Sequence, residues 1–164
     1  MRSLIFVLVF VAGFVGGTQF PSYGLQYQQR VTARFDQAAT DLTPFQAIAD
    51  RHHGGSMARL IQHHLRSSDP TFYEEGMAIQ AMVDNYDRLQ ESVAGLDGSL
   101  LGQLGYLITD ADRELAAQTW AGYRPTLVTE PNTFVFAAMV GAGLCVFAWL
   151  ISLFASTLIR RAIS

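Results

Sequence analysis

The sequence contains no lysine and only one cysteine, so two common contributors to structure and recognition are absent or nearly so. A single cysteine, Cys145, can form neither an intrachain disulfide nor a thiolate cluster for a metal, which excludes a disulfide-stabilised domain. Arginine supplies all of the positive charge, and the formal net charge is −3. Because the chain lacks the basic surface that nucleic acids require, we expect no nucleic-acid partner.

Charge is also missing from two long stretches. Residues 133–159 contain no charged side chain, and Arg160 and Arg161 follow directly. As a helix this stretch would be roughly 40 Å long, more than the roughly 30 Å hydrocarbon core of a bilayer. The pattern predicts a transmembrane helix, because the buried helices of soluble proteins are rarely so long.

The other uncharged stretch, residues 3–20, follows Arg2 and has two interpretations. It is either a signal peptide cleaved near Val15-Gly16-Gly17 or a first transmembrane helix that is retained. We favour retention, because the apolar run passes the candidate cleavage site and leads directly into Pro21. The chain then divides into a transmembrane helix at 3–20, a helical domain at 21–131 and a transmembrane helix at 133–159.

The arginines also indicate an orientation. Arg2 flanks one apolar stretch and Arg160 and Arg161 flank the other, whereas residues 19–132 hold eight arginines and all 14 acidic residues, a net charge of −6. Because arginine-rich flanks stay in the cytoplasm, we expect both termini there and the central domain in the periplasm. The lipid bilayer is thus the first partner that the sequence predicts.

Small residues recur at helical spacing in both apolar stretches. Gly13 and Gly17 form a GxxxG pair, with Ala12 and Gly16 at the same spacing, and Ala137, Gly141 and Cys145 follow one another at four-residue intervals. Such residues allow two membrane helices to approach closely, so the two stretches are expected to pack on each other or on a second copy. Glycine is also simply frequent in membrane helices, which is the alternative explanation.

The central segment lacks the period-two alternation of β-strands, which predicts an all-α fold: two transmembrane helices bracketing a periplasmic antiparallel helical domain. Pro21 is expected to begin a helix after a bend at Phe20, and Thr43-Pro44 to begin a new or kinked one. Later helices are predicted from Ser56 to Leu65, from Asp69-Pro70 to about Ala94, over 100–108, and from a cap within Thr109-Asp110-Ala111-Asp112 to about Gly122, with a turn at Gly54-Gly55 and an extended link over 123–131.

Two apolar seams are predicted to hold the two long helices of this domain together. One consists of Val31, Phe35, Ala38, Leu42, Phe45 and Ala49, and the other of Phe72, Ile79, Met82, Tyr86, Leu89 and Val93. Asp84 and Arg88, one turn apart, are expected to pair on the solvent face.

The histidines form two pairs, His52-His53 and His63-His64. On one helix the pairs would lie roughly 16 Å apart, too far for one metal. The Gly54-Gly55 break could fold them together, but no acidic or thiol ligand is placed to complete a site, so we interpret them as surface or loop histidines. Metal binding and pH sensing are the alternatives. No nucleophile is paired with a base, so no catalytic residue, no cofactor and no enzyme are predicted.

Two stretches rich in polar and aromatic residues lie where the domain is expected to meet the membrane. They are interpreted as interfacial anchors, or alternatively as a partner-binding surface. The residues are Gln19, Pro21, Tyr23, Gln26, Tyr27, Gln29 and Arg30 in the first stretch, and Trp120, Tyr123, Arg124 and Pro125 in the second.

These two stretches together match a two-part sequence pattern. The pattern GxQxPx(F/Y)xxQYxQR after a first apolar helix, followed later by TWxx(F/Y)RP before a second, resembles a family of bacterial inner-membrane proteins classed as a domain of unknown function. Gly17 and Thr119 match it together with the residues just named, and the layout covers nearly the whole chain. The link after Pro125 departs from the pattern, and residues 51–70 have no counterpart. The resemblance implies a two-span inner-membrane protein and no particular activity.

We therefore expect a structural or accessory protein of a bacterial inner membrane, whose periplasmic domain binds another membrane protein or a second copy of itself. A ligand-sensing module that acts through a separate partner is the alternative, and so few residues follow the second span that no output domain is expected. A polar pocket inside the helical domain would favour sensing, whereas a solid core with an exposed arginine-bearing patch would favour the accessory protein.

Overall fold

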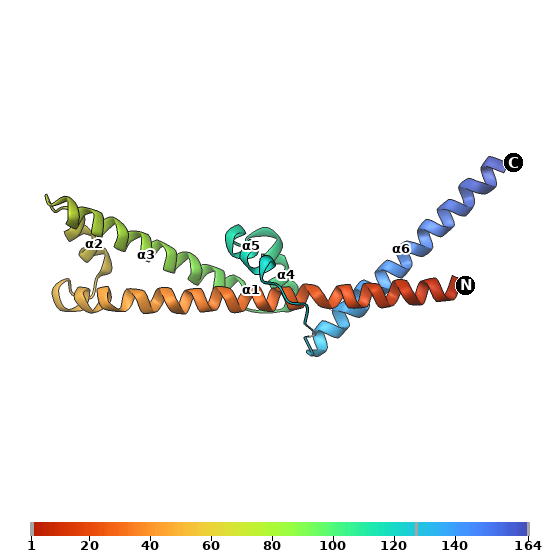
Figure 1. Ribbon diagram of the computed structural model, residues 1–164, viewed down its shortest axis with the longest axis horizontal. Helices are drawn as coiled ribbons and strands as arrows, with labels where there is room; N and C mark the ends of the chain where they lie inside the picture. Colours follow the sequence, from red (N-terminus) through yellow and green to blue (C-terminus); the bar gives the residue numbers. More distant parts are fainter. Residues whose placement is uncertain (1, 127, 164) are drawn as a thin grey trace.

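The computed structural model describes residues 2–126 and 128–163, with side chains described for 3–126 and 128–154. These residues form helices and no strands, which confirms the all-α class. Figure 1 shows an elongated molecule in which one long helix runs along nearly the whole length. The helices are α1 (Arg2–His52), α2 (Met57–Leu65), α3 (Pro70–Gly95), α4 (Leu100–Thr109), α5 (Arg113–Ala121) and α6 (Pro131–Ile163).

The first helix, α1, is continuous for 51 residues and contains Pro21 and Pro44. The predicted bend at Phe20, helix start at Pro21 and interruption at Thr43-Pro44 are therefore wrong. A proline inside a helix costs about 3 kcal/mol, which favours a break when nothing else holds the two sides in line. Here both sides of Pro21 are held, because Gly17 packs against Ala137 of α6 and Tyr23 donates a hydrogen bond to the Ala116 carbonyl of α5. Tertiary contacts thus offset the local preference.

The far end of the molecule is a turn built by local chemistry, as predicted. Gly54 and Gly55 have φ angles of +58° and +77°, a region that glycine enters without strain, and they end α1. The Ser56 hydroxyl caps α2 by accepting from the Arg59 N–H, and Asp69 caps α3 by accepting from the Thr71 N–H. α3 then returns alongside α1 in the opposite direction (Figure 1).

The two predicted seams form the contact between α1 and α3. Val31, Ala38, Leu42 and Ala49 of the first seam are buried, as are Ile79 and Leu89 of the second. Half-buried Phe35 stacks on Tyr86 with ring centroids 5.0 Å apart. A cluster of Tyr27, Val31, Ala38, Leu89, Leu96 and Leu115 extends this core to where α5 joins.

Phe72 is the exception, because its side chain is 47% exposed. At this end α2, and not α1, covers α3: a methyl group at Gly76 would lie 2.8 Å from the Cβ of His64. Phe72 lies one turn before that contact, and its ring is 5.6 Å from that of His64 on α2. Its assignment to the buried seam is wrong.

At the other end α6 crosses α1 and then diverges from it (Figure 1). The link between α5 and α6 is not helical over 123–126 and 128–130, which confirms the predicted extended connection. The large apolar residues of the two helices mostly face outward, including Leu4 at 64%, Phe147 at 61% and Phe154 at 69% exposure.

Candidate functional site

Close packing between α1 and α6 depends on small residues. A methyl group at Gly13 would lie 2.9 Å from the Gly141 Cα, and one at Gly17 would lie 2.9 Å from the Ala137 Cα. Such distances are too short for a side chain, so the backbones touch only because glycine is there. Further along, the Cys145 Sγ donates to the Phe6 carbonyl oxygen at 3.4 Å. Gly13, Gly17, Ala137, Gly141 and Cys145 thus lie along a contact within one chain, whereas Ala12 and Gly16 are exposed.

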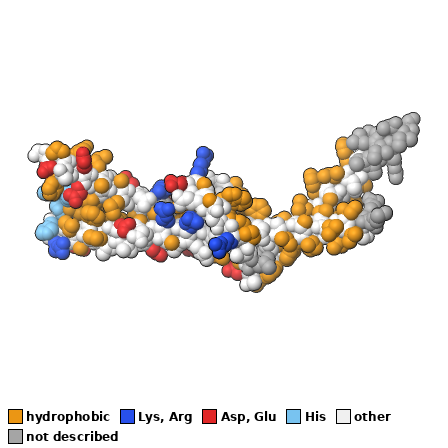
Figure 2. Space-filling view, viewed as in Figure 1, with side chains coloured by type: hydrophobic (Ala, Val, Ile, Leu, Met, Phe, Trp, Pro, Cys, Tyr) orange, Lys and Arg blue, Asp and Glu red, His pale blue; other side chains and the backbone are white. Residues whose placement is uncertain are grey.

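Both helices contain a segment long and apolar enough to cross a membrane. Their most apolar windows have mean hydropathies of 2.0 in α1 and 2.4 in α6. Figure 2 shows hydrophobic side chains over the described part of this end of the molecule, with no charged side chain among them. Among the described residues, charged side chains begin in the α5–α6 link, which contains Arg124 and Glu130.

The two polar-aromatic stretches meet at the base of this apolar end, although about a hundred residues separate them in sequence. The Tyr123 hydroxyl donates to the Gln19 Oε1 at 2.7 Å. The Gln26 side chain binds the Arg124 backbone on both sides: its Nε2 donates to the carbonyl at 2.8 Å, and its Oε1 accepts from the N–H at 3.2 Å. These bonds fix the α5–α6 link against α1, a pairing that sequence spacing gave no means to predict.

Aromatic rings complete this junction, which we define as the contact of residues 19–30 with residues 119–126. The rings of Tyr23, Trp120 and Tyr123 lie about 6 Å from one another, and the last two are nearly parallel. Trp120 nevertheless leaves 71% of its surface exposed. Pro21 is buried on α1, whereas Pro125 is exposed in the link.

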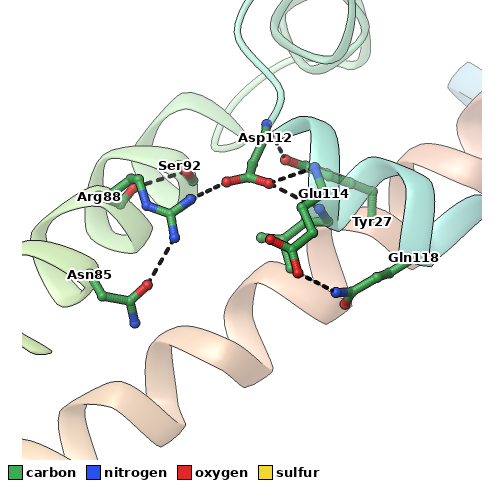
Figure 3. Close-up of polar contacts among 8 residues, drawn as sticks. Tyr27, Asn85, Arg88, Ser92, Asp112, Glu114 and Gln118 are labelled. Carbon is green, nitrogen blue, oxygen red and sulfur yellow. Dashed lines mark hydrogen bonds and ion pairs between the residues drawn. The ribbon is translucent and has the colours of Figure 1, made fainter. Parts of the chain in front are cut away.

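A second polar cluster ties three helices together beside the junction (Figure 3). Asp112 caps α5, since its Oδ1 accepts from the N–H groups of Glu114 at 2.9 Å and Leu115 at 3.0 Å. Its Oδ2 accepts from the Arg88 guanidinium of α3. Its own N–H donates to the hydroxyl of fully buried Tyr27 on α1 at 3.0 Å. The Leu115 N–H and the charge of Arg88 hold the pKa of the Asp112 carboxyl below its ordinary value.

Arg88 therefore does not pair with Asp84, and that expectation is wrong. The Asp84 carboxylate instead accepts from the Gln80 Nε2 at 2.7 Å. Arg88 reaches across to α5 and also donates to the Asn85 Oδ1 at 2.9 Å. An exposed pair one turn apart contributes only a few tenths of a kcal/mol, so a capping carboxylate on a neighbouring helix competes easily. The sequence predicted a cap within residues 109–112 without singling out Asp112, and no local pattern indicated that Arg88 would bind it.

One buried polar group of the junction is left unpaired in the part of the chain that the structure describes. The Nε atom of Arg30 is buried and has no hydrogen-bond partner among the described residues. Its Nη2 lies 3.4 Å from where a methyl group at Gly122 would be, which places the guanidinium against the end of α5. Around it, Gln26, Gln29, Ala33 and Arg34 line an open groove of about 490 Å³. Figure 2 shows arginine side chains gathered over this middle part of the molecule.

The histidine pairs are brought together by the Gly54-Gly55 turn. The rings of His53 and His63 have centroids 5.3 Å apart, and the His64 Nε2 lies 3.6 Å from a carboxylate oxygen of Glu75. Sequence reasoning missed Glu75 because it comes from α3. Within the described part of the chain, no three His, Cys, Asp or Glu side chains are grouped so that they could hold a metal. Desolvation, and then the neighbouring His63, lower the pKa of His53.

Comparison with known proteins gives a family and no function. No curated protein and no solved structure matches the chain. One family, described as a protein of unknown function, matches residues 1–161. Since the match spans nearly the whole sequence, the chain belongs to the DUF2937 family of proteins of unknown function.

Proposed function

We propose that this protein is a non-enzymatic accessory protein of a bacterial inner membrane that binds a partner through the groove around Arg30. In this proposal α6 and residues 3–20 of α1 are anchored in the bilayer. The remaining part of α1 and helices α2 to α5 form a periplasmic domain. The partner is another membrane protein or a second copy of the chain, and it presents a carboxylate to Arg30.

Exposure supports the membrane anchor. In the most apolar windows of α1 and α6, only 17% and 11% of the residues are buried within the molecule. A core helix of a soluble protein would bury most of its large apolar side chains, because their exposure to water is unfavourable by about 25 cal/mol per Å². Lipid removes that penalty. The flanking arginines, Arg2, Arg160 and Arg161, favour the cytoplasm for both termini; the side chains of these three lie outside those that the structure describes.

The orphaned Arg30 Nε is the observation that carries the partner proposal. A buried N–H without an acceptor costs about 1–3 kcal/mol, and more when the group is charged. The other polar groups of the junction are largely satisfied inside the chain: Gln19, Tyr23 and Gln26 all bond to α5 or to the link. Arg30 is the exception, with exposed Gln29 beside it. A carboxylate in the groove would accept from this guanidinium, which lies against the end of α5.

Ligand sensing is the competing proposal, and it receives less support. The described polar hollow inside the domain, between Arg34, Arg88 and Asp112, has a volume of about 60 Å³ and is too small for most ligands. A larger groove of about 490 Å³ lies between α1 and α3, around Leu42, Met57 and Tyr86, but it opens on the surface. The arrangement fits a packed core with an exposed arginine better than a sensory pocket.

Site-specific photo-crosslinking in living cells tests the proposal. A photoreactive amino acid at Gln29 is expected to give an adduct in the membrane fraction, whereas the same residue at Gln90, an exposed glutamine on α3, should give none. The adduct should disappear in the Arg30→Gln variant. Its mass distinguishes a second copy from a different protein.

The stability of the Arg30→Gln variant is the control that shows whether the substitution disturbs the fold. Because the Arg30 Nε has no partner among the described residues, the substitution should leave the unfolding midpoint in mild detergent unchanged or slightly raised. Equal adducts from Gln29 and Gln90, or an adduct at Gln29 that survives Arg30→Gln, would show that the groove is not the binding site.

A further inference from the structure

Helix α4 has apolar side chains on two opposite sides. It contains no charged residue, and none of its residues is fully buried. Tyr106 and Leu107 pack inward, Tyr106 against Gly95 of α3 and Leu107 against Gly24 of α1. On the outward side, Leu101 is 67% and Ile108 is 86% exposed. These two residues lie two turns apart on one face, with Leu104 between them.

An apolar helix of ten residues is usually either a buried core helix or a segment at a membrane surface. The exposure of Leu101 and Ile108 excludes burial within the molecule. The length excludes a span, since about 20 residues are needed to cross the hydrocarbon core. The remaining possibility is a segment at the membrane surface, which requires that α4 lie at the depth of the lipid headgroups.

The position of α4 along α1 gives that depth. Leu107 meets Gly24, one turn and about 6 Å beyond Phe20, where the first apolar stretch ends. Figure 1 shows α4 beside α1 near the start of α6, where the second apolar stretch begins. The polar boundary of a bilayer is roughly 5–8 Å thick on each side, so Leu107, near the C-terminal end of α4, lies at headgroup level. Exposed side chains of α1 at the same level, Phe20 at 61% and Leu25 at 41%, continue the apolar surface.

We propose that α4 is an interfacial helix, which lies on the bilayer that α1 and α6 cross and inserts Leu101, Leu104 and Ile108 at the boundary between headgroups and acyl chains. The inference rests on the proposed membrane anchor. Its partner is the lipid surface itself, and the contact fixes how the domain stands on the membrane. Trp120, 71% exposed at the junction, belongs to the residue type most enriched at that boundary.

Depth-dependent fluorescence quenching of the full-length protein in vesicles tests this. In a Cys145→Ser background, single cysteines at Ile108, at Leu101, at Val11 in the apolar part of α1, and at Asp87 on α3 each receive an environment-sensitive dye. The vesicles are phosphatidylethanolamine and phosphatidylglycerol, with nitroxide quenchers placed either near the headgroup or near the acyl end. Circular dichroism checks that each labelled protein is folded.

The dyes at Ile108 and Leu101 should be quenched several-fold more by the shallow nitroxide than by the deep one. The dye at Val11 should show the reverse, and the dye at exposed Asp87 should respond to neither. Quenching at Val11 without quenching at Ile108 and Leu101 would overturn the interfacial helix and leave the membrane anchor standing. Absence of quenching at all four sites would overturn both.

The alternative to lipid is that a second copy of the chain covers the exposed face of α4. It would leave the dyes at Ile108 and Leu101 in an apolar environment that depends on protein concentration and persists in detergent without vesicles. That result would also overturn the lipid contact.

Discussion

The hydroxyl of Tyr27, on α1, accepts a hydrogen bond of 3.0 Å from the backbone N–H of Asp112, the residue that caps α5. The side chain of Asp112 meanwhile binds Arg88 of α3. Through Asp112, the long helix α1 is therefore connected both to α5 and to α3. Tyr27 is fully buried, so this contact is made without competition from water.

Removal of that hydroxyl should destabilise the domain. Tyr27→Phe leaves the Asp112 N–H without its partner in a buried setting, which is expected to cost about 1–3 kcal/mol. Chemical unfolding of the full-length protein in mild detergent measures the loss. Tyr73→Phe is the matched control, because Tyr73 is 47% exposed, and its effect should stay within about 0.5 kcal/mol. Equal effects of the two substitutions would refute the role of the Tyr27 hydroxyl.

Asp112 should make stability depend on pH in acid. Its pKa is lowered in the folded protein, chiefly by the Leu115 N–H, so the unfolded chain binds the proton first as the pH falls. The stabilisation is thus complete above the unfolded value of 3.8 and is lost as the pH falls through the lower, folded value. The stability difference between the wild type and Asp112→Asn should be largest near neutral pH and shrink toward about pH 2.

The stack of Phe35 on Tyr86 tests the contact between α1 and α3. Phe35→Ala removes a half-buried ring from the seam and should destabilise the domain by about 3 kcal/mol, near the lower end for a phenylalanine truncation. Asp87→Ala, an exposed position next to Tyr86, should change stability by about 0.5 kcal/mol or less. Circular dichroism during thermal unfolding compares the two variants. Identical melting temperatures would mean that the seam does not hold the helices together.

The close packing of α1 on α6 is tested by a substitution at Gly13, with the same substitution at Gly16 as the control. Gly13→Leu places a side chain where even a methyl group would lie 2.9 Å from the Gly141 Cα, whereas Gly16 has nothing within 4 Å. Overpacking of this kind costs about 1–3 kcal/mol, which is roughly a 5- to 150-fold change in the equilibrium between packed and separated helices. Oxidative crosslinking of Cys145 to a cysteine at Phe6 reports that fraction. It should fall strongly in Gly13→Leu and remain unchanged in Gly16→Leu; equal crosslinking in both would argue against close packing at Gly13.

Features with a local cause were predictable from the sequence. The turn at Gly54-Gly55, the caps at Ser56 and Asp69, a cap within residues 109–112, and the buried period of Val31, Ala38, Leu42 and Ala49 all follow from a few neighbouring residues. The small residues Gly13 and Gly141 were identified in the same way, from spacing alone.

Features decided by distant contacts were not predictable. The local chemistry of Pro21 favours a helix start, and only the contacts of α6 and α5 on either side keep α1 continuous. Arg88 has an acidic neighbour one turn away in sequence, yet it binds Asp112 on another helix. The junction joins residues 98 and 104 positions apart, so its two halves were recognised separately and their pairing was not.

The arrangement of the chain across the membrane is the central claim, and cysteine accessibility in intact cells tests it most directly. The protein carries an epitope tag before Met1, the Cys145→Ser change, and one cysteine either at exposed Asp97 or after Ser164. We expect a membrane-impermeant maleimide to label the Asp97 position in intact cells. The position after Ser164 should react only after permeabilisation, and the tag should remain on the membrane-bound protein. Labelling after Ser164 with protection at Asp97, or loss of the tag, would contradict a two-span protein with its domain in the periplasm.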